Sequence, residues 1–329
     1  MATPEILRKY REPIVARLEG VLQKRGPLGE MFCYHMGLQE ADGSPGPGIG
    51  GKLLRPSLVC FSCEALGGQI DAALPLAAAL ELVHNFSLIH DDIQDKDELR
   101  RGRPTVWKVY GVEQAINAGD GLLVLALRTA LETKDLTPET AVAAQKTLLS
   151  ATYRMIEGQV LDLSLEGRAA GVAEYLDMAR KKTGALIGCA MELGGIAAGA
   201  DEELRGKLRE LGEVLGLAFQ IRDDWIGIWG DPGVTGKPVG SDLLRRKRSF
   251  PVAYALERDP SLEELLSQDP LPLEEVLGRL ESTGSKEATE GAARKYVREA
   301  DRIAAGLPWE PWAKTAFGEL LSFLVDREA

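Results

Sequence analysis

Apolar residues recur at intervals of three and four along most of the chain, which is the spacing of one face of an α-helix. Runs of alternating β-branched residues, which would indicate strands, are missing, and the strong helix formers Ala, Leu and Glu dominate. The pattern therefore predicts an all-α fold. We expect helices over residues 4–24, 54–66, 71–98, 111–132, 138–165, 172–198, 202–230, 249–257, 262–266, 273–281, 286–305 and 311–327.

Two segments rich in glycine and proline interrupt the helical pattern. They are DGSPGPGIGG at residues 42–51 and GDPGVTGKPVG at residues 230–240, and their composition predicts loops. Helical periodicity resumes at once on both sides of each loop, so neither resembles a linker between domains. We therefore predict a single domain over residues 1–329.

Composition and charge narrow the class of protein. Of 329 residues, 45% are hydrophobic and 27% charged, which is ordinary globular usage. The formal net charge of −11 argues against nucleic acid as a partner. The charged start of the chain lacks a secretory apolar core, no uninterrupted apolar run reaches the length of a bilayer span, and the four cysteines form no disulfide or zinc pattern. We expect a cytoplasmic protein without a transmembrane segment.

One cluster of carboxylates closes an apolar helix. In LIHDDIQD, Asp91, Asp92 and Asp95 are three or four residues apart, so they share one helical face. Like charges so placed repel one another, and oxygen-only ligands favour a hard ion such as Mg²⁺. The alternative is a solvated acidic helix end, which the spacing alone leaves open.

A second cluster repeats the pattern. Asp223 and Asp224 follow the apolar run VLGLAFQI, and Asp231 follows shortly afterwards. Two aspartate pairs that each end an apolar helix could hold metal ions between them.

Basic residues accompany both aspartate clusters. Arginine and lysine bind phosphate oxygens, and a basic set on an acidic protein favours a small ligand with several phosphate groups. Taken singly, each could be a solvated surface charge. His84, seven residues before Asp91, fits either a ligand contact or a hydrogen-bonded core histidine. The chain has no P-loop, kinase motif, dinucleotide-binding fingerprint or serine-hydrolase elbow.

These motifs together resemble a known family. GGKLLRP, ELVHNFSLIHDDIQD, LRRGRPT, RKKTG and FQIRDD followed by GDPGVTGKPVGSD occur in an order and spacing similar to the trans-isoprenyl diphosphate synthases, or polyprenyl synthetases. The resemblance runs from about Gly50 to Pro251. It implies an all-α bundle around a deep central cavity, with the two aspartate motifs facing each other across its mouth and binding three Mg²⁺ with an allylic diphosphate.

The resemblance also implies roles for individual residues. The implied metal ligands are Asp91, Asp92, Asp95, Asp223 and Asp224, and the residues implied to serve catalysis are Asp91, Asp92, Asp95, Arg100, Lys182, Asp223 and Lys237. The implied contacts to the allylic diphosphate are Arg100, Lys182, Thr183, Gln220, Lys237 and Lys247. The implied contacts to isopentenyl diphosphate are Lys52, Arg55, His84 and Arg101.

Two departures from the family pattern affect these roles. Leu53 stands where the family's glycine-rich loop usually carries an arginine, while Lys52 and Arg55 remain. Gly227 stands where many members carry the third aspartate of the second motif. We expect isopentenyl diphosphate binding to survive the first departure, and Asp231 is one candidate to compensate for the second.

The implied reaction is ionisation of the allylic diphosphate, attack by isopentenyl diphosphate and loss of a proton. Phe86 and Ser87, just before an aspartate motif without an insertion, resemble the archaeal-type geranylgeranyl diphosphate synthases, which implies a C20 product and a homodimer. Four alternatives stay open. They are a farnesyl or longer-chain synthase, a class I terpene cyclase, a non-catalytic helical partner subunit and a purely structural bundle.

Overall fold

The computed structural model describes residues 3–22, 26–133, 136–235 and 238–326, and they are mostly helical. This confirms the all-α prediction. Residue contacts group the chain into two compact units. The first unit comprises Glu5–Leu149 and Ala190–Arg205, and the second comprises Met1–Pro4, Ser150–Cys189 and Gly206–Ala329. Three of the four boundaries fall inside helices, α8 (Pro138–Leu165), α10 (Ala185–Ala197) and α11 (Glu202–Trp229), and none falls in the predicted loops. The single domain over 1–329 stays a prediction.

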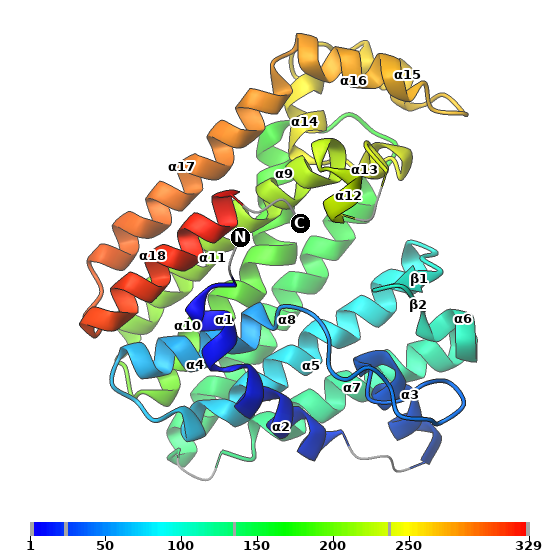
Figure 1. Cartoon of the computed structure of the whole chain (residues 1–329). Coiled ribbons are helices and arrows are strands. Elements are labelled where there is room, and N and C mark those ends of the chain that lie inside the picture. Colours follow the sequence, from blue (N-terminus) through cyan, green and yellow to red (C-terminus); the bar gives the residue numbers. More distant parts are fainter. Residues whose placement is uncertain (1–2, 23–25, 134–135, 236–237, 327–329) are drawn as a thin grey trace. The chain divides into compact units, whose positions relative to one another are not determined.

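The first unit is built around one long helix, α5 (Figure 1). Helices α2, α4 and α7 pack against it, and α3 packs on α7. A two-residue antiparallel hairpin, in which Arg100 pairs with Arg103, follows α5. The elements of this unit are α1 (Glu5–Lys9), α2 (Arg11–Val21), α3 (Gly26–Met36), α4 (Leu54–Ala65), α5 (Ile70–Gln94), β1 (Leu99–Arg100), β2 (Arg103–Pro104), α6 (Val106–Tyr110), α7 (Val112–Ala130) and the first part of α8 (Pro138–Leu165).

In the second unit, the short helix α14 packs against several neighbouring helices. Helix α14 contacts α9, α16 and α17, and α17 runs along α18 (Figure 1). Its apolar core includes Tyr175 of α9, Ile221 of α11 and Phe250 of α14. Its elements, beyond the rest of α8, are α9 (Val172–Ala179), the π-helical turn η1 (Arg180–Gly184), α10 (Ala185–Ala197), α11 (Glu202–Trp229), α12 (Pro232–Thr235), α13 (Ser241–Leu244), α14 (Phe250–Leu256), α15 (Leu262–Leu266), α16 (Leu273–Ser282), α17 (Ser285–Ala305) and α18 (Pro311–Asp326), with the ends of α10 and α11 in the first unit.

Helix α5 is long and apolar enough to cross a membrane by length and composition alone. However, 78% of its most apolar window is buried inside the protein, as is common for the core helix of a globular fold. Its alanines and leucines account for this burial, because they pack against α4 and α7. Its apolar character is therefore explained by the core that it forms.

The structure differs from the predicted elements in a few places. Helix α3 was not expected, because Gly26, Pro27 and Gly29 suggest a turn. A proline in the first turn costs a helix nothing, since the N–H groups there have no partner within the helix. The predicted helix 4–24 is divided at Tyr10, and the predicted helix 172–198 contains the π-helical turn. π-Helical turns are frequent at functional sites, and this one carries Lys182 and Thr183.

Candidate active site

The first aspartate motif lies at the carboxyl end of α5. The helix ends at Gln94, and its last turn contains no basic residue. Asp92 is buried, Asp91 is half-buried and Asp95 is exposed. A helix carries partial negative charge at this end, so carboxylates here are electrostatically unfavourable unless a cation offsets them. The motif is therefore placed where a cation stabilises it.

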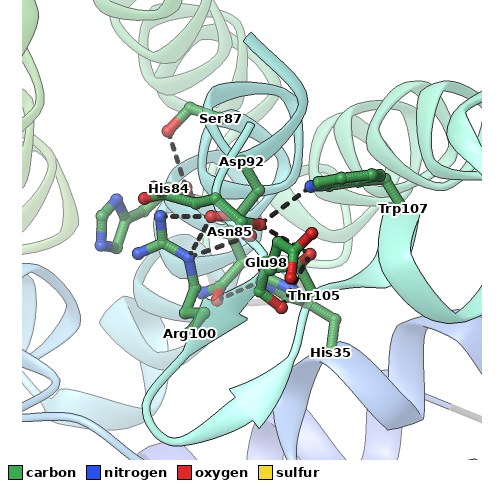
Figure 2. A network of polar contacts seen from close by, with 10 residues as sticks. His35, His84, Asn85, Ser87, Asp92, Glu98, Arg100, Thr105 and Trp107 are labelled. Carbon is green, nitrogen blue, oxygen red and sulfur yellow. Dashed lines mark hydrogen bonds and ion pairs between the residues drawn. The ribbon is translucent and has the colours of Figure 1, made fainter. Parts of the chain in front are cut away.

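Arg100 supplies one such cation. From strand β1 it reaches back to Asp92, with Nε 2.8 Å from Oδ1 and Nη2 2.7 Å from the same oxygen (Figure 2). Burial raises the pKa of the Asp92 carboxyl, and the arginine opposes this shift. Thr105 and Trp107 both donate hydrogen bonds to the carbonyl oxygen of Asp97, which fastens the hairpin to the end of α5. The pairing leaves Asp91 and Asp95 as the more accessible carboxylates of the motif.

Two to three turns earlier, α5 carries a polar network that includes His84 and Glu81. The Arg55 guanidinium lies 3.3 Å from His84 Nε2. Burial lowers the pKa of His84 well below its usual value, and Arg55 and Arg101 lower it further, so the ring is neutral. Burial raises the pKa of Glu81, while Arg55 and Arg101 oppose that shift. The structure thus brings Arg55, His84 and Arg101 together around a carboxylate, Glu81, that the sequence analysis did not single out.

The glycine-rich loop leads into α4 beside this network. Lys52 is exposed, whereas Leu53 is buried and has a left-handed backbone, with φ of 48°. The leucine that replaces the family's usual arginine therefore contributes to the core. Lys52 and Arg55 are the basic residues that this segment retains.

The two residues expected to control product length lie on the buried part of α5. Phe86 is 4% exposed, and its ring meets the His90 ring edge to face at a centroid distance of 5.8 Å. Ser87 donates a hydrogen bond of 2.7 Å to the carbonyl oxygen of His84, so its hydroxyl group is satisfied within its own helix (Figure 2). His90 in turn packs over Gly119 of α7, where a Cβ atom would lie 2.1 Å from its Nε2.

In the second unit, the two aspartates of the second motif have different surroundings. Asp223 is exposed, whereas Asp224 is 5% exposed. The Asp224 carboxylate accepts hydrogen bonds from the Phe250 N–H at 2.8 Å and from Gln220 Nε2 at 2.9 Å. Burial raises the pKa of Asp224 to about 7 despite these bonds. Asp224 thus joins α11 to the start of α14.

The same network continues to the π-helical turn. Thr183 donates a hydrogen bond of 2.6 Å to Gln220 Oε1, so Thr183, Gln220 and Asp224 form a chain. Lys182 is paired with Asp162 of α8. Only a glycine fits at position 158 of α8, since a Cβ atom there would lie 2.1 Å from the backbone nitrogen of Lys182. Asp162 and Tyr175 belong to none of the motifs, so the sequence alone did not indicate them.

At Gly227, where many family members carry the third aspartate of the second motif, an aspartate from another helix, α13, lies close by. A Cβ atom at Gly227 would lie 2.1 Å from Oδ2 of Asp242, so the Asp242 carboxylate lies where a side chain at 227 would begin. Lys247 Nζ lies 4.0 Å from the other oxygen of Asp242. Asp231, the candidate to compensate for this departure, accepts a hydrogen bond from the Gly233 N–H in a turn. Lys237 lies outside the described residues.

The carboxylate oxygens of the two aspartate motifs are the donors considered for a metal ion. Among the residues that the structure describes, no group of three or more His, Cys, Asp or Glu side chains is close enough to hold a metal ion. The accessible carboxylates of the two motifs, Asp91, Asp95 and Asp223, suit a hard divalent cation. Such an ion commonly takes only one or two protein carboxylates and completes its coordination with water and substrate phosphates. The donor set of each unit fits that mode of binding.

Comparisons with known proteins agree with this chemistry. Residues 47–277 match the family model described as "Polyprenyl synthetase". The chain is 50% identical over 234 residues to a geranylgeranyl diphosphate synthase of Mycobacterium tuberculosis, covering 70% of this chain and 66% of the relative. It is 39% identical to a (2E,6E)-farnesyl diphosphate synthase of Mycobacterium bovis, covering 99% of this chain and 94% of the relative.

Solved structures are also similar over nearly the whole chain. The crystal structure of a polyprenyl synthetase from Streptomyces coelicolor aligns with a TM-score of 0.90 and 38% identity, covering 97% of this chain and 98% of that one. The crystal structure of a geranylgeranyl pyrophosphate synthetase from Pyrococcus horikoshii aligns with a TM-score of 0.88 and 32% identity, covering 98% of this chain and 97% of that one. The fold and the motif-bearing segments are thus both shared with these proteins.

Proposed function

Because the chain belongs to the polyprenyl synthetase family and is a trans-prenyl diphosphate synthase, we propose that it makes geranylgeranyl diphosphate, a C20 product. The family's substrates are isopentenyl diphosphate and allylic diphosphates. The observation that carries the proposal is the arrangement of α5, in which accessible carboxylates at the helix end follow directly after Phe86 and the small Ser87. The 50% identity to a geranylgeranyl diphosphate synthase supports the same product.

The five aspartates of the two motifs divide into two roles in this proposal. The family uses a divalent metal ion, and we assign it here as Mg²⁺, three per active site. Asp91, Asp95 and Asp223 are the accessible carboxylates and ligate the ions. Asp92 and Asp224 have hydrogen bonds to Arg100 and to the network of Gln220, so they chiefly position the binding groups around them. When bound, Mg²⁺ neutralises charge on the departing diphosphate.

The basic residues bind the two substrates. Arg100, Lys182, Thr183, Gln220, Lys237 and Lys247 contact the allylic diphosphate, and Lys52, Arg55, His84 and Arg101 contact isopentenyl diphosphate. Arg100 and Lys182 stabilise the negative charge that develops as the carbon–oxygen bond breaks. The double bond of isopentenyl diphosphate then attacks the allylic C1, and the released diphosphate takes the proton that is lost. The neutral His84 has a low pKa and is a poor base, which is consistent with a reaction that needs no protein general base.

Product analysis tests the assignment of chain length. Purified protein with Mg²⁺, isopentenyl diphosphate and C5, C10 or C15 allylic starters is expected to give C20 diphosphate as the main product by mass. In Phe86→Ala, loss of the buried ring removes the bulk that stops the growing tail, so products longer than C20 are expected. Ser87→Ala is the matched control, since Ser87 is already small. Main products of C15 or C25 from the wild type, or an unchanged product from Phe86→Ala, would contradict the assignment.

The same assay distinguishes the other candidates. A class I terpene cyclase would release hydrocarbon without isopentenyl diphosphate, and a non-catalytic partner subunit would be inactive alone. The retained Lys52, Arg55 and Arg101 argue against a cyclase, and the two aspartate motifs argue against an inactive subunit. A farnesyl synthase is the alternative that one relative supports directly. We place the enzyme in the cytoplasm, in isoprenoid biosynthesis.

We also propose that the enzyme is a homodimer. Exposed apolar side chains recur along α8 at intervals of three, four and seven residues, which is the spacing of a helix that packs against another helix. They are Val142, Leu149, Tyr153, Ile156, Val160 and Leu163. The double variant Tyr153→Glu with Val160→Glu is expected to sediment as a monomer, because it places two charges in this stripe. Lys314→Glu, at an exposed position of α18 outside this stripe, should leave the dimer intact. A wild-type monomer, or a double variant that remains dimeric, would exclude this surface.

A further inference from the structure

We propose that Arg11, on the first turn of α2, is a positioning residue for isopentenyl diphosphate because it holds the glycine-rich loop that carries Lys52. The inference rests on the proposed function, since it assumes that Lys52, Arg55 and Arg101 bind this substrate. Arg11 lies about forty residues before the loop in sequence and belongs to none of the motifs. It was not a candidate from sequence alone.

The guanidinium of Arg11 bridges two carbonyl oxygens of the loop. Nη2 donates a hydrogen bond of 2.8 Å to the carbonyl oxygen of Ile49, and Nη1 donates one of 2.9 Å to that of Gly51. A guanidinium is a planar fork with fixed donor directions, so two such bonds determine the orientation of the intervening peptide units. The next residue is Lys52. Its backbone is therefore fixed on one side by Arg11.

Arg101 also contacts the glycine-rich loop, at Gly51. A Cβ atom at Gly51 would lie 2.9 Å from Nη2 of Arg101 and 3.3 Å from its Cζ, so the guanidinium lies directly against this glycine. Gly51 also has φ of 81°, a conformation that L side chains rarely adopt. The loop thus contacts two guanidinium groups. Arg11 binds its carbonyl oxygens, and Arg101 packs against the face of Gly51.

The replacement of the family's usual arginine gives this contact its importance. Leu53 is buried in the core and has no polar group to offer the loop or the substrate. Lys52 is exposed and has a long flexible side chain, so its affinity for a diphosphate depends on where the backbone presents it. The Gly51 carbonyl lies at an exposed hydrogen bond, and water can replace Arg11 there. Loss of Arg11 should therefore disorder the loop without unfolding the unit.

Steady-state kinetics of Arg11→Gln test this role. We expect KM for isopentenyl diphosphate to rise about tenfold, with kcat and KM for the allylic diphosphate within about twofold of the wild type. Arg11→Lys keeps the charge, but one nitrogen cannot bridge both carbonyl oxygens, so KM should still rise about threefold or more. Arg17→Gln is the matched control, because Arg17 is on the same helix and pairs with Glu132, away from the loop. It should show wild-type kinetics.

Three results would overturn the proposal. They are a wild-type KM for isopentenyl diphosphate in folded Arg11→Gln, full retention of KM in Arg11→Lys, and an equal rise in both KM values. Failure of the proposed function is recognised separately, because the wild-type enzyme would then not consume isopentenyl diphosphate at all. Added guanidinium ion should partly restore the low KM in an Arg11→Ala variant and leave the Arg17→Gln enzyme unaffected.

Discussion

Replacing Asp91 by alanine is expected to lower kcat by about a thousandfold or more while leaving the melting temperature unchanged. Asp91 is a half-buried carboxylate at the negative end of α5, in a last turn without a basic residue. Its removal relieves an unfavourable charge in the free protein, so folding should not suffer. In the complex, however, it removes a ligand for the ion that stabilises the departing diphosphate. Single-turnover measurements at saturating Mg²⁺ give the rate of the chemical step.

A matched variant shows whether the effect belongs to the motif or to charge in general. Asp71→Ala removes an exposed carboxylate from the first turn of the same helix. It should retain wild-type turnover and lose a little stability, because a carboxylate is favourable at a helix amino terminus. Turnover near the wild-type value in Asp91→Ala would refute its assignment as a metal ligand.

The second large expected effect distinguishes Asp223 from Asp224, which are adjacent in the sequence. Asp223→Ala is expected to lower kcat by about two to three orders of magnitude with an unchanged free energy of unfolding, because Asp223 is exposed. Asp224→Ala is expected to lower the free energy of unfolding by roughly 2 to 4 kcal/mol. It leaves the buried Phe250 N–H and the Gln220 side-chain donor without their acceptor. Urea denaturation and kinetics on both variants measure the two quantities.

The contrast has a conservative control. Asp224→Asn keeps one acceptor oxygen for the Phe250 N–H, so its stability should lie between those of the wild type and Asp224→Ala. Equal destabilisation by the two alanine variants, or full activity in Asp223→Ala, would contradict the division of roles between the two aspartates.

Helices α5 and α11 could be predicted from the sequence because apolar periodicity and the aspartate pairs occur in contiguous segments. Helix α5 ends at Gln94, four residues before the predicted Glu98. Local patterns also gave the short helix α15 with the bounds that the structure has. Helix α3 could not be predicted, since its glycines and proline oppose helix formation and its apolar face is satisfied only by packing on α7. The strength of tertiary contacts outweighs propensity there.

Most of the partners of the site residues were beyond prediction, because these contacts form only when separate helices and turns pack together. The Asp242 carboxylate beside Gly227 and the Asp162 partner of Lys182 depend on how other helices pack. The pairing of Arg100 with Asp92 needs a hairpin of only two residues per strand, which has no alternating pattern to detect. Glu81 did carry a signal, since a carboxylate within an apolar helix is rarely buried without a partner.

The central proposal is that both aspartate motifs are needed to bind the allylic diphosphate. Binding of a non-hydrolysable allylic thiodiphosphate with Mg²⁺, measured by calorimetry on the wild type, Asp91→Ala, Asp223→Ala and the double variant, tests it most directly. We predict that each single change weakens binding at least about a hundredfold and that the double change weakens it little further, because both residues act on one complex. Wild-type affinity in either single variant, or losses that simply add in the double variant, would contradict the account.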